Sequence, residues 1–306
     1  MNLRDKIEAI KSRADYSKDQ LYLIEAINEN SGFLLGDDRV FYIISHNETN
    51  NDAISTKYLS LKTNIYINTV ENEPSFKPGY YDLLIYSGDI NLVFFESFIE
   101  LCSKFNYEQE TLSFIDFFYS LLKLFELPKE VSYTNLVGLF GELVLIKFAY
   151  EKYNKEIFKF WHNSLGSTDK YDFSFPAFNI EVKTTVKEGM RFEIKHSQIF
   201  NEKDNFVAVI NIDNDNSGMS VSEIFDYFKT TKPFSGSIDF MIKLQQEKQK
   251  VYENDFKEKK FSLSRILLFS NKTISTIHEI PNFIDSIHYM YDFASQEPVS
   301  FDSIFK

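Results

Sequence analysis

The chain has 306 residues, a hydrophobic content of 43% and a net charge of -12. This length suits two domains or one elaborated domain, and the apolar content supports a sizeable core, in which 32 phenylalanines and 18 tyrosines must dominate the packing. The single cysteine, Cys102, excludes an intramolecular disulfide framework and suits a reducing cytoplasm. Because the sequence opens with charged residues and no apolar run approaches membrane-spanning length, we expect a cytoplasmic protein without membrane contact.

The first 127 residues indicate an α+β region. Helices are predicted near residues 6–10 and 20–24, and short strands follow at 32–35, 40–44, 58–68 and 80–86, separated by turns rich in Asn and Ser. Two apolar helices, at about residues 92–105 and 110–125, complete this region, which carries no recognisable motif. Residues 127–130, with Pro128, predict a hinge. We therefore expect one domain over residues 1–127 and a second over residues 128–306.

A helix is predicted over about residues 135–153, after the polar starters Ser132 and Thr134. Its middle, L-V-G-L-F-G-E-L-V-L-I, is apolar on nearly every side, so we expect most of its surface to be buried. Glu142 is the only charge in that run. A buried carboxylate is costly unless it is paired or binds a metal. Glu142 is therefore a candidate metal ligand, the alternative being a carboxylate that pairs with a lysine or extends to solvent at the edge of the core.

Residues 171–184 read Y-D-F-S-F-P-A-F-N-I-E-V-K-T. Alternation around Ile180 predicts a strand that places Glu181 and Lys183 together on the face opposite Ile180. A shorter strand after Asp172 predicts an antiparallel hairpin that brings Asp172 beside Glu181. Two carboxylates so placed repel each other unless a cation lies between them, and Mg2+ prefers such hard oxygen ligands. The alternative is an ordinary solvated strand face.

The C-terminal half as a whole predicts the element order helix, strand, strand, strand, helix, strand. Residues 206–212 form an almost continuous apolar run of strand length and are the best candidate for a central strand. Helices are predicted at residues 221–229 and 237–250, and strands at 265–269 and 287–293. The sequence has no phosphate-binding glycine loop, no serine-hydrolase elbow and no zinc-ligand spacing of histidines, so these chemistries are not supported.

Together these residues resemble the PD-(D/E)XK nuclease superfamily. The match consists of G-E-L on a helix, D-F and E-V-K-T on a hairpin, and Ser197-Gln198-Ile199 after a further strand, over about residues 136–200. Within the superfamily, the chain most closely resembles a bacterial family of restriction-like proteins. The resemblance implies an α/β protein with a restriction-endonuclease-like core, a mixed sheet flanked by helices, in the C-terminal half.

The resemblance also implies a site and a reaction, the Mg2+-dependent hydrolysis of nucleic-acid phosphodiesters, with Mn2+ as a substitute ion. Asp172 and Glu181 would bind the metal, and Glu142 would bind it directly or through water. Lys183 would orient the attacking water or stabilise the charge at phosphorus. Gln198 would position the site or a phosphate. The implied setting is restriction or phage defence on DNA, beside ATPase and methyltransferase partners.

The net charge of -12 counts against nucleic-acid binding, because DNA-binding proteins commonly carry a basic surface. A local group in and after the motif, Lys183, Lys187, Arg191 and Lys195, could nevertheless contact phosphates as the substrate-binding surface. The main alternative is a non-catalytic subunit that keeps the PD-(D/E)XK fold and serves as an interaction module of a defence complex. A third possibility is a nuclease acting on RNA, or on modified or branched DNA.

Overall fold

The structure is a computed structural model, which describes residues 2–45, 51–71, 73, 76–105, 112–125, 132–162, 170–186, 189–199, 203–274 and 287–306. The chain forms two compact units, Met1–Glu126 and Leu127–Lys306. The hinge predicted at residues 127–130 lies outside the described residues. Each unit has its own sheet and is described by itself.

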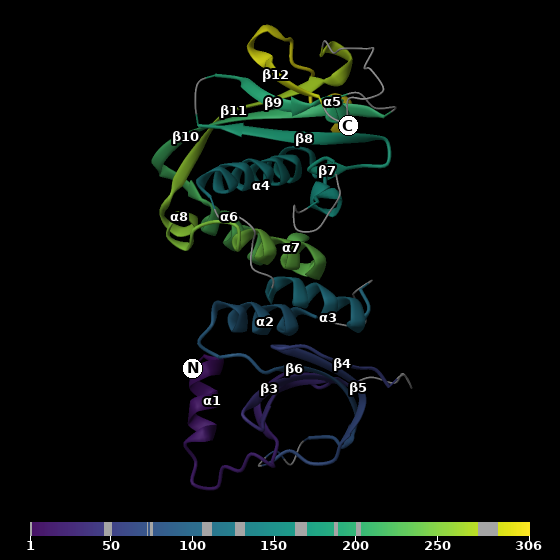
Figure 1. Ribbon diagram of the computed structural model, residues 1–306, viewed down its shortest axis with the longest axis vertical. Coiled ribbons are helices and arrows are strands. Elements are labelled where there is room, and N and C mark those ends of the chain that lie inside the picture. Colours follow the sequence, from purple (N-terminus) through teal and green to yellow (C-terminus); the bar gives the residue numbers. More distant parts are fainter. Residues whose placement is uncertain are drawn as a thin grey trace. The chain divides into compact units, whose positions relative to one another are not determined.

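The first unit begins with helix α1 (Leu3–Lys11) and continues into a six-stranded antiparallel sheet. The strand order is β1-β2-β3-β6-β5-β4, with β1 at Tyr22–Asn28, β2 at Ser31–Gly36, β3 at Arg39–Ser45, β4 at Ala53–Ser55, β5 at Leu59–Ile67 and β6 at Gly79–Tyr86. A parallel bridge between Tyr22 and Glu71 joins the chain after β5 back to β1. The sheet is therefore strongly curved, like a small barrel (Figure 1).

Apolar side chains lie on both faces of this sheet. On one face, the rings of Phe33 and Tyr86 contact Phe98 of helix α2 (Val93–Lys104), and Tyr42 contacts Phe114 of helix α3 (Phe114–Leu122). A short 3-10 turn, Lys123–Phe125, follows α3. The other face carries a second apolar cluster. Two buried faces explain why these strands are rich in apolar residues throughout.

The helix predicted near residues 20–24 is wrong, because this segment leads into strand β1. Tyr22 and Ile24, which are 2% and 7% exposed, alternate with more exposed neighbours, as a strand with one buried face requires. The periodicity of a short apolar run cannot distinguish a helix from a strand. Here the segment forms a strand because it pairs with β2. Strand β4 also forms where no strand was expected.

The second unit contains a four-stranded mixed sheet in the order β11-β10-β8-β7. Strand β10 (Asp204–Ser220) runs parallel to β8 (Phe178–Thr185) and antiparallel to β11 (Lys260–Ser270), while β7 (Phe173–Ser174) pairs antiparallel with β8. Residues Val207 to Ile210 are at most 3% exposed. The prediction of a central strand at residues 206–212 is thus confirmed.

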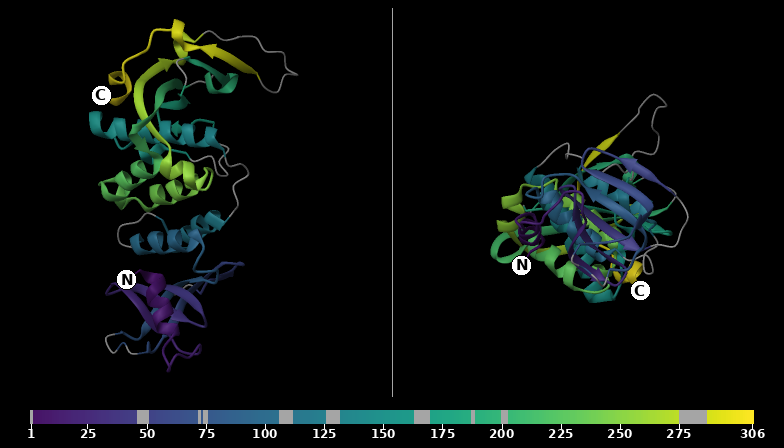
Figure 2. Two further views of the ribbon diagram at one scale, coloured as in Figure 1. Left: turned by 90° about the vertical axis from the view of Figure 1, so that its left-hand side faces the viewer. Right: turned by 90° about the horizontal axis from the view of Figure 1, so that it is seen from below.

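Helix α4 (Tyr133–Tyr153) packs on one face of this sheet, with its closest approach at Gly141. A Cβ at Gly141 would lie 1.8 Å from Oγ1 of Thr184 in β8, so only glycine fits there. At Gly138 a Cβ would meet open space, so the second glycine of the helix is not closely packed. Figures 1 and 2 both show α4 between the sheet and helices α6 (Val221–Thr230) and α7 (Ile238–Lys248).

The opposite face of the sheet is covered by a two-stranded sheet of β9 (Arg191–Lys195) and β12 (His288–Asp292). Ile194 of β9 is fully buried in a cluster with Val207 and Phe269 of the main sheet. The unit also contains α5 (His196–Ile199), α8 (Glu253–Glu258), α9 (Asp302–Phe305) and 3-10 turns at Ile157–Phe160, Phe234–Gly236, Asn271–Thr273 and Phe293–Ser295.

The chain is thus a mixed α/β protein with a multi-stranded sheet flanked by helices, an arrangement compatible with a PD-(D/E)XK fold. None of the helices in the described part of the chain has the length and apolar content that crossing a bilayer requires.

Candidate active site

The β7–β8 hairpin places Asp172 beside Glu181. Phe173 pairs with Ile180 and Ser174 with Asn179, and the same antiparallel register continued by one residue sets Asp172 opposite Glu181. Oδ2 of Asp172 accepts a 2.6 Å hydrogen bond from the backbone N–H of Val182. The predicted hairpin is therefore confirmed, and its backbone fixes one oxygen of the Asp172 carboxylate.

Glu181 and Lys183 form a largely buried ion pair rather than a solvated strand face. Nζ of Lys183 lies 2.7 Å from Oε1 of Glu181, and the two side chains are 22% and 8% exposed. Ile180, on the other side of the strand, is fully buried as expected, although Val182 is only half-buried. A buried carboxylate with one lysine partner is not what an ordinary exposed strand supplies.

Glu142 reaches this region from helix α4, and its carboxylate is bonded to Trp161. The indole Nε1 of Trp161 donates a 2.6 Å hydrogen bond to Oε2 of Glu142. Trp161 is fully buried and forms an isolated antiparallel bridge with Phe173 of β7. The partner of Glu142 in this bond is thus an indole next to the hairpin.

The three carboxylates influence one another. Burial raises the pKa of Asp172 to about 8, with repulsion from Glu181 adding to the effect, while the Val182 N–H and Lys183 oppose it. Burial and the nearby Asp172 also raise the pKa of Glu142 well above its usual range, against the effect of the Trp161 hydrogen bond. The carboxyl groups of Glu142 and Asp172 therefore resist simultaneous ionisation, which is the condition that a bound cation relieves.

Glu247 is a further acidic residue of this region that sequence reasoning missed. Its charge contributes to the raised pKa of both Glu142 and Asp172. It is 8% exposed near the end of α7 and forms an ion pair with Lys250, which is also 8% exposed. Helical spacing could have revealed it, because Glu247 interrupts the buried stripe Phe240, Leu244, Val251.

Comparison with known families gives a match over most of the chain. Residues 35–293 match the family described as "Putative PD-(D/E)XK family member, (DUF4420)". The chain belongs to this family. No curated protein and no solved structure shows a significant match to it. The family match covers most of the chain, and it includes the strands of the first unit from β3 onward as well as the whole candidate site.

The residues of this PD-(D/E)XK family member fit a divalent metal in donor chemistry but are not gathered around one point. Asp172, Glu181 and Glu142 offer hard carboxylate oxygens, which Mg2+ and Mn2+ prefer. Among the residues that the structure describes, however, no three Asp, Glu, His or Cys side chains converge closely enough to hold a metal ion. Each carboxylate instead has a protein partner, namely the Val182 N–H for Asp172, Lys183 for Glu181 and Trp161 for Glu142.

Gln198 binds backbone groups at the start of α5. Its Oε1 accepts a 3.0 Å hydrogen bond from the Lys195 N–H, and its Nε2 donates a 3.2 Å bond to the Lys170 carbonyl. The side chain thus connects the end of β9 to the segment that enters Asp172. A role in positioning the site stays a prediction, and the structure assigns the amide two structural partners.

Of the four basic residues predicted to contact phosphates, Lys183 contacts a carboxylate of the site, and two others lie on strand β9. Arg191 and Lys195 are exposed on strand β9, and Glu193, which pairs with His288, lies between them on the same side of the strand. Lys187 lies outside the described residues. Glu142, Asp172, Glu181 and Lys183 are therefore neighbours that do not converge on one point, and their roles, like phosphate binding by β9, stay predictions.

Proposed function

We propose that this family member hydrolyses phosphodiester bonds of nucleic acid, with DNA as the substrate, and requires Mg2+ or Mn2+. The observation that carries the proposal is the pairing of Asp172 and Glu181 across one hairpin, with the amine of Lys183 2.7 Å from Glu181. A buried and a half-buried carboxylate held next to each other with one lysine cost stability unless they serve a cation and a phosphate.

In this proposal each residue has a separate task. Asp172 and Glu181 hold the metal, and Glu142 adds a third carboxylate from helix α4, directly or through water. A divalent ion held there supplies Lewis-acid stabilisation of the negative charge that develops on the phosphate. Lys183 orients the water that attacks phosphorus and stabilises the same charge. Trp161 restrains the carboxylate of Glu142 through its 2.6 Å hydrogen bond.

The contacts and protonation of these side chains would have to change before a metal could bind. Nζ of Lys183 is bonded to Glu181, so this ion pair would have to open for Glu181 to hold a metal, which would leave the amine free to contact a substrate. The raised pKa of Asp172 means that metal binding near neutral pH releases a proton. Metal binding by this cluster should therefore strengthen as the pH rises.

Two observations favour a second candidate, a non-catalytic module that keeps the fold. The described residues contain no ready three-ligand metal set, and the net charge is -12. Such a module would use the PD-(D/E)XK core as an interaction subunit of a defence complex. The same family setting leads us to propose a role in restriction or phage defence, with ATPase or methyltransferase partners that deliver the DNA.

A cleavage assay separates the two candidates. Supercoiled plasmid is incubated with the purified chain and Mn2+ at low salt, where the phosphate contacts of an acidic protein are least screened. We expect nicking that falls by at least about 100-fold in Glu181→Gln and Lys183→Ala. Glu258→Gln, an exposed glutamate on α8, serves as the matched control and keeps wild-type activity.

Activity that survives in both Glu181→Gln and Lys183→Ala rejects this assignment of the site. A wild type that binds Mn2+ but cuts neither plasmid nor branched or single-stranded substrates favours the non-catalytic module.

A further inference from the structure

The curved sheet of the first unit encloses a cavity of about 400 Å³. The cavity lies where the sheet closes on itself, since its walls include Leu21 on one side of the seam and Glu71 on the other, and the Glu71 N–H donates a 2.7 Å hydrogen bond to the Leu21 carbonyl. Mouths of curved and barrel-like sheets are common ligand sites, and this volume is within the range of binding pockets.

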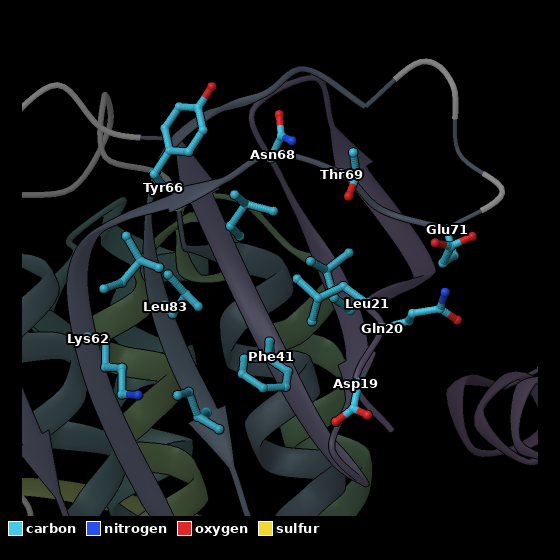
Figure 3. Close-up of a pocket in the computed structure, with 14 residues that line it drawn as sticks. Asp19, Gln20, Leu21, Phe41, Lys62, Tyr66, Asn68, Thr69, Glu71 and Leu83 are labelled. Carbon is cyan, nitrogen blue, oxygen red and sulfur yellow. The ribbon is translucent and has the colours of Figure 1, made fainter. Parts of the chain in front are cut away.

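The cavity has an apolar floor and a polar rim (Figure 3). Leu21, Phe41 and Leu83 lie in its centre, and Asp19, Gln20 and Glu71 lie together toward one end. The floor continues into the apolar cluster of the sheet, so a ligand group that enters it would leave water for a preformed apolar surface. Both acidic side chains of the rim are exposed.

Exposed apolar side chains extend this surface beyond the cavity. Ile65 and Tyr66, two of the lining residues, are 38% and 56% exposed. The rings of Tyr66 and Tyr80 are packed edge to face, with 5.2 Å between their centroids, and Tyr80 is also 56% exposed. Uncovered tyrosines beside an apolar pocket are typical of protein-binding surfaces.

A β-bulge holds this part of the surface in place. The register between β5 and β6 shifts between Lys62 and Ile65, and Asn64 adopts a left-handed conformation with φ of 55°. Oδ1 of the buried Asp82 accepts a 2.8 Å hydrogen bond from the Asn64 N–H. The bulge thus sets the direction of Ile65 and Tyr66, and bulges often serve this purpose near binding sites.

The charge of the first unit indicates the kind of partner. Residues 1–126 contain 20 of the 45 acidic residues but only 11 of the 33 lysines and arginines, which is a net charge of -9 out of the total of -12. Among the lining side chains that the structure describes, Lys62 is the one basic residue, against Asp19 and Glu71. The negative electrostatic potential of the first unit repels phosphates and attracts cationic groups.

We propose that this cavity docks an extended, basic segment of another protein. An apolar side chain of the segment enters the cavity and packs on Leu21, Phe41 and Leu83. Neighbouring lysine or arginine side chains of the segment pair with Asp19 and Glu71, and an arginine can also stack on Tyr66. The proposal concerns the first unit alone and does not depend on nuclease activity in the second.

Peptide selection against the full-length chain tests the proposal with a defined probe. Random dodecapeptides displayed on phage are selected at low salt, and the enriched peptides are synthesised and measured by fluorescence anisotropy. We expect enriched peptides to combine a large apolar residue with lysine or arginine. Asp19→Lys/Glu71→Lys should weaken their binding about tenfold and remove most of its salt dependence. Tyr66→Ser should also weaken binding.

The matched control is Glu8→Lys/Glu29→Lys, which makes the same change in net charge at two exposed positions outside the cavity lining. The proposal is overturned if this control weakens binding as much as Asp19→Lys/Glu71→Lys, or if the enriched peptides are neutral or acidic. It is also overturned if single-stranded oligonucleotides displace the peptides and Lys62→Glu abolishes that effect, which would assign the cavity to nucleic acid. Self-association that disappears in Asp19→Lys/Glu71→Lys would instead assign it to a second copy of the chain.

Discussion

The indole of Trp161 and the carboxylate of Glu142 are joined by a 2.6 Å hydrogen bond. Trp161 also bridges Phe173, next to Asp172, so this bond connects helix α4 to the hairpin that carries the other carboxylates. Trp161 is the only tryptophan of the chain and is fully buried. It therefore restrains one acidic residue of the candidate site and provides a spectroscopic reporter for the whole cluster.

Replacing this indole should destabilise the fold, because Glu142 then loses its hydrogen-bond donor. Trp161→Phe leaves the half-buried carboxylate without its donor, and we expect a loss of about 1–3 kcal/mol in the free energy of unfolding. Urea denaturation of Trp161→Phe, Glu142→Gln and the double variant measures the coupling between the two side chains. Effects that add within about 0.5 kcal/mol would show that the hydrogen bond contributes nothing.

The two glycines of helix α4 should respond in opposite ways to alanine. At Gly141 the new Cβ would lie 1.8 Å from Oγ1 of Thr184, so α4 must move away from β8, and we expect a loss of about 1–3 kcal/mol. At Gly138 the Cβ meets open space, and Gly138→Ala should stabilise the helix by up to about 1 kcal/mol. Thermal unfolding of both variants is the measurement. Equal effects at the two positions would contradict the described packing of α4.

The raised pKa of Asp172 predicts how stability changes with pH in the absence of metal. Because its pKa rises from 3.8 to about 8 on folding, the folded protein holds this proton more tightly than the unfolded chain does. The contribution of Asp172 to stability is therefore full at acidic pH and is lost as the pH rises through about 4 toward about 8.

Asp172→Asn removes this titration and can still accept the Val182 hydrogen bond through its amide oxygen. We expect the variant to gain stability relative to the wild type between pH 5 and pH 8, by about 1–3 kcal/mol at the upper end. Denaturant unfolding at several pH values checks it, with the exposed Asp226→Asn on α6 as the control. A difference between wild type and Asp172→Asn that does not change with pH would refute the raised pKa.

The structural and catalytic roles of Lys183 should be separable by substitution. Lys183→Ala leaves Glu181 largely buried without its partner, and since the lysine side chain is 22% exposed we expect a modest loss of about 1–2 kcal/mol. Adding Glu181→Gln should restore most of that stability. Mn2+ affinity should persist or increase in Lys183→Ala, because a competing cation has been removed. Calorimetric titration tests this, and weaker Mn2+ binding would show that the lysine does not compete with the metal.

The sequence predicted the hairpin and helix α4 well because their signals are local. Alternation around Ile180 and the apolar run around Glu142 determine both elements without help from the rest of the chain. The helix predicted for segment 20–24 was wrong because a short apolar run is compatible with both a helix and a strand until its partner strand is known. Trp161 and Glu247 were missed for a similar reason, since their place beside Glu142 depends on how separate elements pack.

The metal requirement is the central claim, and Trp161 allows it to be measured directly. Mn2+ is titrated into the full-length protein while the fluorescence of Trp161 and the midpoint of thermal unfolding are recorded, because paramagnetic Mn2+ quenches a nearby indole and a ligand of the folded state raises its stability. We predict saturable quenching and a higher midpoint in the wild type, and neither in Asp172→Asn/Glu181→Gln. A wild type that shows no saturable quenching at millimolar Mn2+, and unfolds like the double variant, would contradict a metal-dependent nuclease.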